Sequence, residues 1–326
     1  MGNKRTNILI LSAGRRVELV RCFLAARDNL LANAKVFATD LNPSLSSASQ
    51  VADQCFPSPR AGDVGFADFI EQFAATNSVG LIVPTIDTEL LPLAKIKSKL
   101  AQQGTHISVS DESFVRQCRD KTQSGALFEA IGVRYPKLID WDNPSFPLFA
   151  KPASGSSSKG AMLLQDGARL SELRHSPESY MLMEYIGQPY KEYTVDAYFD
   201  LASQVKSIVP RLRLDVRAGE VSKGITCCNG LFEKLKTGLQ NWRNVQGCIT
   251  IQVFYDENSD DVVGLEVNPR FGGGYPLTHQ AGAKFVDWLV AETLLGKAPQ
   301  PFDSWESDLL MLRYDAAIWV KNAKPQ

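Results

Sequence analysis

Short apolar runs alternate with longer amphipathic stretches along the N-terminal part of the chain. The apolar runs at 8–11, 35–39, 79–83 and 106–109 have the length of buried strands, and the stretches at 17–26, 65–76 and 89–102 have the spacing of helices. A further stretch at 111–131 predicts one helix that ends before Gly132 and Pro136. Strands that alternate with helices predict a doubly wound parallel sheet, whose ligands bind beyond the carboxyl ends of the strands.

The pattern changes after Phe146, where short predicted strands follow one another with few helices between them. These strands are expected at 148–151, 161–164, 180–185, 194–200, 205–210, 248–255 and 262–267. Two helices are expected at 231–241 and 284–295. This succession predicts an α+β region built on antiparallel sheet, so the fold class is α/β followed by α+β.

Composition narrows the class of protein. The chain has 326 residues, of which 44% are hydrophobic, so it is long enough for two or three domains with sizeable cores. A net charge of −1 gives no basic footprint for nucleic acid and no polybasic segment for a membrane surface. Six cysteines without a CxxC pair favour free thiols, and no apolar stretch approaches the length of a membrane helix, so we expect a cytoplasmic protein.

A dinucleotide site is one interpretation of the first strands. Asp40 ends the second predicted strand, where an acid can bind a ribose. The turn after the first strand has Gly14 alone and lacks GxGxxG, so the close approach to a pyrophosphate is not provided. We therefore favour another use of this sheet.

A loop of small residues joins two predicted strands at 148–161. Its glycines and serines can wrap an anion with backbone N–H groups, although a flexible hairpin turn has the same composition. It is not a Walker loop, because it lacks GxxxxGK[ST] and no helix follows. Lys151 closes an otherwise apolar strand, and burying a lysine is costly unless it meets a negative group. Lys151 therefore favours the anion-binding interpretation.

The run LEVNPRFGGG, residues 265–274, presents the same problem near the other end. Glu266 and Asn268 interrupt an apolar strand, where desolvation costs several kcal/mol unless each side chain finds a partner.

Taken in order, these pieces resemble the ATP-grasp superfamily, most closely its carbamoyl-phosphate-synthetase large-subunit-like branch of carboxylate-amine ligases, which includes stand-alone proteins. The resemblance covers residues 7–320 and includes SAGRR at 12–16, PTIDTE at 84–89, PRLR at 210–213 and GEVSKG at 219–224. It implies a pre-ATP-grasp Rossmann-like domain at 1–110, an N-terminal lobe with phosphate loop and adenine hinge at 111–186, and a C-terminal lobe with the metal and substrate site at 187–326.

The resemblance also implies ligands. ATP would bind together with two magnesium ions, and manganese could replace magnesium. Phosphates would meet Lys121, Lys151 and the loop residues Gly155, Ser156, Ser158 and Gly160. Adenine would be lined by Glu184, Tyr185 and Ile186, and the ribose hydroxyls would be held by Glu192. Metal would be faced by Gln252, Glu266 and Asn268.

Strand geometry supports the metal assignment independently. Side chains alternate along a strand, so Glu266 and Asn268 share one face while Leu265 and Val267 point the other way. The strands at 248–255 and 262–267 should pair as a hairpin, which brings Gln252 to the same face. One acid and two amide oxygens suit magnesium that shares its coordination with phosphates. Because Gln252 stands where many superfamily members have a second acid, we expect tight metal binding to require ATP.

The catalytic candidates are Arg270, Arg211 and Lys223. By the resemblance, Arg270 would stabilise charge on an acyl phosphate, although a surface arginine in a salt bridge is the alternative. Arg211 and Arg213 alternate on one strand face and either grip a substrate carboxylate or form an exposed basic face. His279 has the chemistry of a general base, but its setting favours a structural role. Loops at 211–223 and 272–278 are expected to shape the specificity surface, and Gly272–Gly274 to let the backbone approach an anion.

The resulting hypothesis is an ATP-dependent carboxylate-amine (or thiol) ligase that forms an amide through an acyl phosphate and releases ADP and phosphate. Its partners would be a small-molecule carboxylate and an amine or other nucleophile, with no nucleic acid, no membrane and a homodimeric assembly. Two alternatives remain: a carbamoyl-phosphate-synthetase-like subunit that phosphorylates bicarbonate or carbamate, and a non-catalytic ATP-binding regulatory protein.

Overall fold

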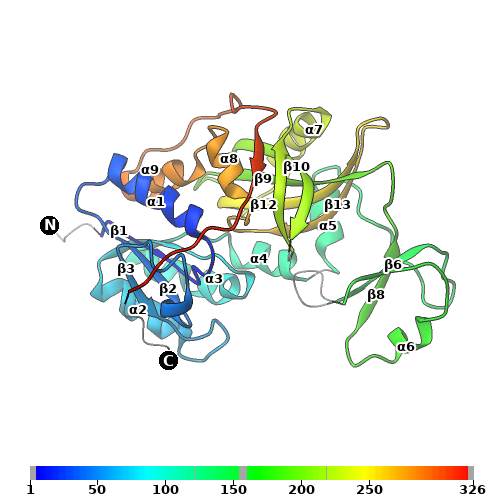
Figure 1. Ribbon diagram of the computed structural model, residues 1–326, viewed down its shortest axis with the longest axis horizontal. Coiled ribbons are helices and arrows are strands. Elements are labelled where there is room, and N and C mark those ends of the chain that lie inside the picture. Colours follow the sequence, from blue (N-terminus) through cyan, green and yellow to red (C-terminus); the bar gives the residue numbers. More distant parts are fainter. Residues whose placement is uncertain (1–4, 121, 154–159, 218, 322–326) are drawn as a thin grey trace.

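Three sheets follow one another along the chain in the computed structural model, which describes residues 5–120, 122–153, 160–217 and 219–321 (Figure 1). The sheets have five, three and six strands in chain order. They start and end close to the predicted domain boundaries at 110 and 186, which themselves stay a prediction. No helix among the described residues is both long and apolar enough to cross a membrane.

The first sheet is parallel, as predicted, with the strand order β3-β2-β1-β4-β5. Its strands are β1 (Asn7–Ile10), β2 (Val36–Asp40), β3 (Gln54–Pro57), β4 (Val79–Val83) and β5 (His106–Ile107). Strand β3 was not predicted, because its four residues at the sheet edge are not buried and carry no apolar run. The order reverses between β1 and β4, so the loops after these two strands flank the switch point at which such sheets bind ligands.

Helices cover both faces of this sheet. The helix α1 (Val17–Leu30) lies on one face together with α9 (Phe285–Leu295), which comes from the far end of the chain (Figure 1). The helices α2 (Phe66–Thr76) and α3 (Asp87–Gln102) lie on the other face. Because α9 completes the apolar core over β1 and β4, the C-terminal part of the chain is fixed to the first sheet.

The helix predicted over 111–131 is broken, so that prediction was wrong as one element. The structure has α4 (Glu112–Arg119) and α5 (Ser124–Glu129). The carboxylate of Asp120 accepts hydrogen bonds from the backbone N–H of Thr122 at 2.9 Å and from its hydroxyl at 2.6 Å. Such local bonds compete with the helical ladder and end the first helix. The second helix packs on the large sheet, where the ring of Phe128 fills the space beside Gly264.

The second sheet forms a small lobe that lies apart from the first sheet, at the right of Figure 1. Its antiparallel strands are β6 (Leu148–Pro152), β7 (Met162–Leu164) and β8 (Tyr180–Glu184), in the order β7-β6-β8, and it carries α6 (Leu170–Arg174). The lobe has its own core, in which Leu148, Leu173 and Leu182 are buried together. The helix α6 was not predicted, because five residues are too few to show a helical period.

The large sheet is antiparallel throughout, as predicted, with the order β13-β12-β9-β10-β11-β14. Its strands are β9 (Lys191–Phe199), β10 (Val205–Arg217), β11 (Glu220–Thr226), β12 (Gly247–Asp256), β13 (Asp261–Asn268) and β14 (Leu310–Leu312). The expected loop at 211–223 is instead the end of β10 and the start of β11. Residues 211–217 alternate leucine or valine with arginine or aspartate, which is the period of a strand. A loop was predicted because the segment carries so many charged residues.

Two further helices pack in the C-terminal part of the chain. The helix α7 (Gly230–Gly238) packs on the back of β10, and α8 (Tyr275–Gln280) follows the glycine run. The expected loop at 272–278 is therefore helical from Tyr275. The helix α8 is tied to the large sheet, since the hydroxyl of Thr278 donates to the carboxylate of Asp196 on β9 at 2.7 Å.

Candidate active site

One face of the large sheet carries polar side chains in adjacent rows. Strand pairing puts Glu266 of β13 beside Gln252 of β12, and Gln252 beside Thr194 of β9. Thr194 in turn lies beside Arg211 of β10. Directly paired residues share a face, so these four side chains point the same way across four strands. The hairpin register predicted from the sequence is confirmed, including the Gln252–Glu266 pair.

Glu266 collects hydrogen bonds from both neighbouring amides. Its Oε1 accepts one from Nε2 of Gln252 at 2.7 Å and one from Nδ2 of Asn268 at 2.8 Å. The amide oxygens face arginines, because Oε1 of Gln252 accepts from Arg213 at 3.2 Å and Oδ1 of Asn268 accepts from Arg270 at 3.2 Å. A carboxylate can only accept and an arginine can only donate, so these partners fix the orientation of both amides.

Lys151 reaches this face from β6 of the small lobe. Its Nζ donates to the hydroxyl of Tyr135 at 3.1 Å and lies 5.5 Å from the centre of that ring. Burial lowers the pKa of Lys151, and the charge of Glu266 acts in the opposite direction. A half-buried ammonium of this kind gains more from a phosphate than an exposed lysine would, because less water has to be displaced.

The residues predicted to line adenine lie at the end of β8 and in the connection to β9. The carboxylate of Glu184 pairs with Arg134 at 3.1 Å, and its backbone N–H donates to the carbonyl of Lys137 at 2.8 Å. The backbone groups of Tyr185 and Ile186 have no hydrogen-bond partner within the described part of the chain. The backbone groups of these two residues are therefore available to an external partner.

Glu192 lies at the start of β9, two residues before Thr194, and faces the same side. It forms an ion pair with Arg213 at 3.1 Å. Burial raises the pKa of Glu192, the charge of Arg213 opposes that shift, and the charge of Glu266 adds to it. Arg213 thus connects Glu192, which is predicted to bind the ribose, with Gln252, which is predicted to face the metal, a contact that strand alternation alone did not reveal.

The loops at the switch point of the first sheet complete the site. Asp87, which begins α3 after β4, forms a two-point ion pair with Arg270, with distances of 3.1 Å to Nε and 2.7 Å to the terminal nitrogen. Arg16, which follows β1, donates to the carbonyls of Phe271 and Thr85, each at 3.2 Å. Burial lowers the pKa of Arg16 to about 10, and the charge of Arg270 contributes to the shift. The stretches 12–16 and 84–89 therefore meet the run that contains Arg270.

Arg211 lies beneath this site, with only 2% of its side chain exposed. Its guanidinium forms an ion pair at 2.7 Å with Asp196, which is fully buried. Asp196 also accepts hydrogen bonds from Thr250 and Thr278, at 3.0 and 2.7 Å. The alternative of an exposed basic face is therefore wrong for Arg211, and its main partner is a protein carboxylate.

The glycine run packs on the same buried group. A Cβ added to Gly274 would lie 2.1 Å from the terminal nitrogen of Arg211, and one added to Gly272 would lie 2.8 Å from the hydroxyl of Thr250. At Gly273 the nearest atom would be the carboxyl carbon of Glu220 at 3.0 Å, the flexible end of a side chain. Two of the three glycines thus accommodate buried side chains of the sheet.

The buried pair gives a stability prediction. Asp196→Asn should lower the free energy of unfolding by about 3 kcal/mol, because it leaves the Arg211 charge buried without its counter-ion. Urea denaturation followed by circular dichroism measures this change. Asp315→Asn is the matched control, since it removes only the exposed pair with Arg217 and should leave the midpoint unchanged. A destabilisation no larger than that of the control would contradict a structural role for the pair.

Two family models match separate parts of the chain. A model described as the PylC-like N-terminal domain matches residues 8–108, and one described as ATP-grasp in the biosynthetic pathway with Ter operon matches residues 176–314. The chain has the ATP-grasp fold. The fold expected from the ordered motifs is thereby confirmed, and Asp40 has no need of a dinucleotide, since its carboxylate accepts the backbone N–H of Gly14 at 2.9 Å.

Individual relatives agree with this ATP-grasp assignment. The C-terminal section of the carbamoyl phosphate synthase large chain of Methanopyrus kandleri is 22% identical over 254 residues, covering 70% of this chain and 44% of that protein. The chain therefore spans less than half the length of this curated relative.

Two solved ATP-grasp structures cover most of the chain. One is the biotin carboxylase domain of Hydrogenobacter thermophilus 2-oxoglutarate carboxylase in complex with magnesium ADP, ADP and bicarbonate. It has a TM-score of 0.72 at 14% identity and covers 93% of this chain and 73% of that chain. The other, the L-amino acid ligase of Bacillus licheniformis, has a TM-score of 0.66 at 17% identity and covers 93% and 76%.

The donor set fits magnesium of the ATP-grasp type. One carboxylate and two amide oxygens are hard oxygen ligands, which magnesium prefers when phosphates supply the rest of its coordination. No group of three histidine, cysteine, aspartate or glutamate residues that could hold a metal occurs in the described ranges. The amide oxygens of Gln252 and Asn268 face arginines, so both amides must turn before they can bind a metal. These observations fit a metal that arrives with a nucleotide.

Several predicted site residues lie outside this set. Lys121, Gly155, Ser156 and Ser158 lie outside the described residues, while Gly160 is described and borders Tyr180 of β8.

Lys223 lies on β11 next to Gly224, which pairs with Arg213, so strand alternation puts Lys223 on the opposite face. There it pairs with Asp215 at 3.5 Å and is half exposed, and its catalytic role stays a prediction. The ring of His279 packs against Tyr275 on α8, and burial lowers its pKa.

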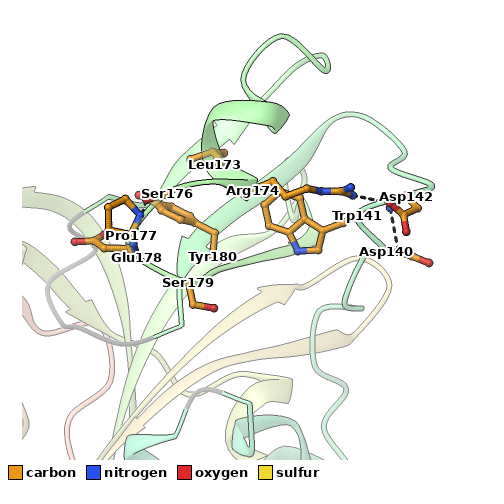
Figure 2. Close-up of a pocket in the computed structure, with 10 residues that line it drawn as sticks. All are labelled: Asp140, Trp141, Asp142, Leu173, Arg174, Ser176, Pro177, Glu178, Ser179 and Tyr180. Atoms are coloured by element: carbon orange, nitrogen blue, oxygen red, sulfur yellow. Dashed lines mark hydrogen bonds and ion pairs between the residues drawn. The ribbon is translucent and has the colours of Figure 1, made fainter.

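A depression in the small lobe is lined by residues of the stretches 140–142 and 173–180. Figure 2 shows Trp141, Arg174 and Tyr180 along it, with the guanidinium of Arg174 paired to Asp142 at 2.7 Å. Arg174 also lies 5.6 Å from the centre of the Trp141 ring. The guanidinium of Arg174 is therefore already paired. None of the residues that line the depression belongs to the predicted site.

Proposed function

We propose that the chain is an ATP-dependent ligase that joins a carboxylate to an amine, or to a thiol, through an acyl phosphate. The observation that carries this proposal is the convergence of Glu266, Gln252 and Asn268 with Lys151 and Arg270. These groups come from two sheets and combine hard metal ligands with cations. Such a combination suits a triphosphate whose terminal phosphoryl group is transferred.

The nucleotide would lie between the small lobe and the large sheet. The free backbone groups of Tyr185 and Ile186 would pair with the base, and Glu192 would bind the ribose hydroxyls. Lys151 would bind a phosphate oxygen, which restores its charge against the cost of burial. Lys121, Gly155, Ser156, Ser158 and Gly160 remain proposed phosphate contacts.

Glu266, Gln252 and Asn268 would hold magnesium, and we infer two ions, with manganese as an effective substitute. Bound magnesium would neutralise charge on the triphosphate oxygens. Glu266 contributes the only carboxylate of this set, so the protein ligands alone do not balance the charge of one divalent ion. Arg213 and Arg270 release the amide oxygens when they turn toward phosphates.

Arg270 would act on the transferred group. As a carboxylate oxygen of the acid forms its bond to the γ-phosphorus, the bond from that phosphorus to ADP breaks. Charge that accumulates on the equatorial oxygens would be met by N–H groups of Arg270 once these leave Asp87, and such contacts are worth most where water is excluded. Nitrogen of the amine then attacks the acyl carbon, phosphate leaves, and the nitrogen loses a proton. An acyl phosphate is reactive enough that no dedicated general base is required.

A second candidate deserves a separate assay, because a curated relative is a section of carbamoyl phosphate synthase. A bicarbonate-phosphorylating subunit would turn over ATP with bicarbonate alone and would need ammonia from a partner. A non-catalytic regulator would bind ATP without turnover. We also propose a small-molecule acid and amine as substrates, a homodimer, the three predicted domains and a cytoplasmic location.

The test is ADP release by the purified chain with magnesium ATP and a panel of acids and amines. We expect release above background only when a suitable acid is present, with an amide mass appearing when an amine is added. Release with bicarbonate alone would favour the carbamoyl-phosphate alternative. Binding of ATP without any release across the panel would favour the regulator and count against a ligase.

A further inference from the structure

Arg270 has almost no hydrogen-bonding capacity left in this structure. Nε and one terminal nitrogen are held by Asp87, that same nitrogen also donates to Asn268, and the other donates to the carbonyl of Phe271 at 3.3 Å. A guanidinium has five N–H groups, and these contacts use four of them. One N–H is left, so Arg270 cannot meet a phosphoryl group at two points without giving up a partner.

Asp87 is the partner that can leave. Asn268 and Phe271 are close neighbours of Arg270 in the chain and stay beside it, whereas Asp87 comes from the loop after β4 of the first sheet. The side chain of Asp87 is 31% exposed, while that of Arg270 is 14% exposed. Water and solutes can thus reach the aspartate side of the pair.

The loop that carries Asp87 is firmly held. Glu89 is buried and accepts hydrogen bonds from the hydroxyl of Ser12 at 2.5 Å and from the backbone N–H of Thr85 at 3.1 Å. The carbonyl of Thr85 accepts from Arg16. Asp87 is therefore presented to Arg270 by a fixed loop, and its carboxylate occupies a defined position over the guanidinium.

We propose that Asp87 is a specificity-determining residue that occupies the place of the substrate carboxylate on Arg270. A two-point pair is displaced best by another anion with two oxygens in a plane, such as a carboxylate or a phosphoryl group. When such an acid displaces Asp87, its carboxylate lies on Arg270 at the place where the phosphoryl group is to be accepted. This inference rests on the proposed ligase function and adds a requirement for the acid before ATP is used.

The reaction that this arrangement suppresses is hydrolysis. Without an acid, water oxygen can form the bond to the γ-phosphorus while the bond to ADP breaks, and the water proton passes to solvent. With Arg270 held by Asp87, the charge on that phosphoryl group lacks its guanidinium. ATP is then spared until a carboxylate is bound.

The test compares Asp87→Asn, Asp87→Glu and the control Asp111→Asn. Asp111 pairs with Lys97 of the same helix α3, away from Arg270. Binding of inorganic phosphate in the presence of magnesium ADP is measured by calorimetry, and ADP release is measured with magnesium ATP and no added acid. Asp87→Asn should bind phosphate about tenfold more tightly and hydrolyse ATP about tenfold faster. Asp111→Asn should behave like the unmodified chain. Asp87→Glu keeps a carboxylate and should therefore bind phosphate less tightly, and hydrolyse ATP more slowly, than Asp87→Asn.

The outcomes separate this inference from the ligase proposal. Unchanged or weaker phosphate binding by Asp87→Asn would overturn the role of Asp87, whatever the chain catalyses. Slower acid-independent release would also overturn it, because a residue that only positions Arg270 for catalysis would have that effect. Tighter phosphate binding without ADP release under any condition would support the displacement of Asp87 and count against the ligase.

Discussion

Glu266→Gln is expected to reduce acid-dependent ADP release by about 10³-fold while the fold is preserved. The substitution removes the only carboxylate of the proposed metal face, and keeps the size of the side chain and one acceptor oxygen for the amides of Gln252 and Asn268. Glu266 is exposed, so its loss exposes no buried charge and should leave the thermal unfolding midpoint unchanged. Steady-state assays over a range of magnesium concentrations measure the effect.

Asp260→Asn provides the control for this substitution. Asp260 lies in the turn of the same β12–β13 hairpin, where its carboxylate accepts from Tyr255 at 2.7 Å, far along the strands from Glu266. Asp260→Asn also replaces a carboxylate by an amide, but outside the proposed metal face. The rate of acid-dependent ADP release should therefore be unchanged. If Glu266→Gln kept more than about a tenth of the rate, the metal assignment would have to be abandoned.

Arg270→Met should lower kcat by about 10³-fold with a much smaller effect on the KM for ATP. Methionine keeps much of the length of the side chain but removes every N–H that could meet the developing charge. Because the proposed contact forms in the transition state, the loss should fall on kcat. Arg217→Met is the control, since Arg217 makes an exposed pair with Asp315 at the end of β10.

If Arg270→Met changed the KM for ATP rather than kcat, Arg270 would have a different role. A large rise in the KM for ATP with an unchanged kcat would mean that Arg270 only binds the nucleotide. Loss of cooperative unfolding would mean that the Asp87–Arg270 pair chiefly joins the first sheet to the large sheet. Either result would remove Arg270 from the proposed chemistry.

The sheets and the metal face could be predicted because their signals are local. Val79–Val83 is a continuous apolar run and appears as β4 with the predicted bounds. The pairing of Gln252 with Glu266 follows from two short strands and one turn, which fix the register. From Arg211 to Arg217 charged residues alternate with leucine and valine, so the two-residue period of a strand was present. The high polarity of this segment nevertheless suggested a loop.

Contacts between distant segments could not be predicted in the same way. Asp87 and Arg270 are 183 residues apart, and their meeting depends on how the first sheet lies against the large one. The sequence marked the stretches 12–16 and 84–89 as features of the family without giving them a role. Likewise, alternation placed Arg211 on the correct face but could not tell that Asp196 would bury it.

The contact between Gly274 and Arg211 links two distant positions in evolution and in mutagenesis. Arg211 is held by Asp196 and cannot retreat, so any side chain at position 274 would collide with its guanidinium. Val221 is also only 2.7 Å from such a Cβ, so a smaller residue at position 211 would not by itself make room. Position 274 is thus restricted to glycine by two neighbouring strands at once, and a side chain becomes acceptable there only after changes at both 211 and 221.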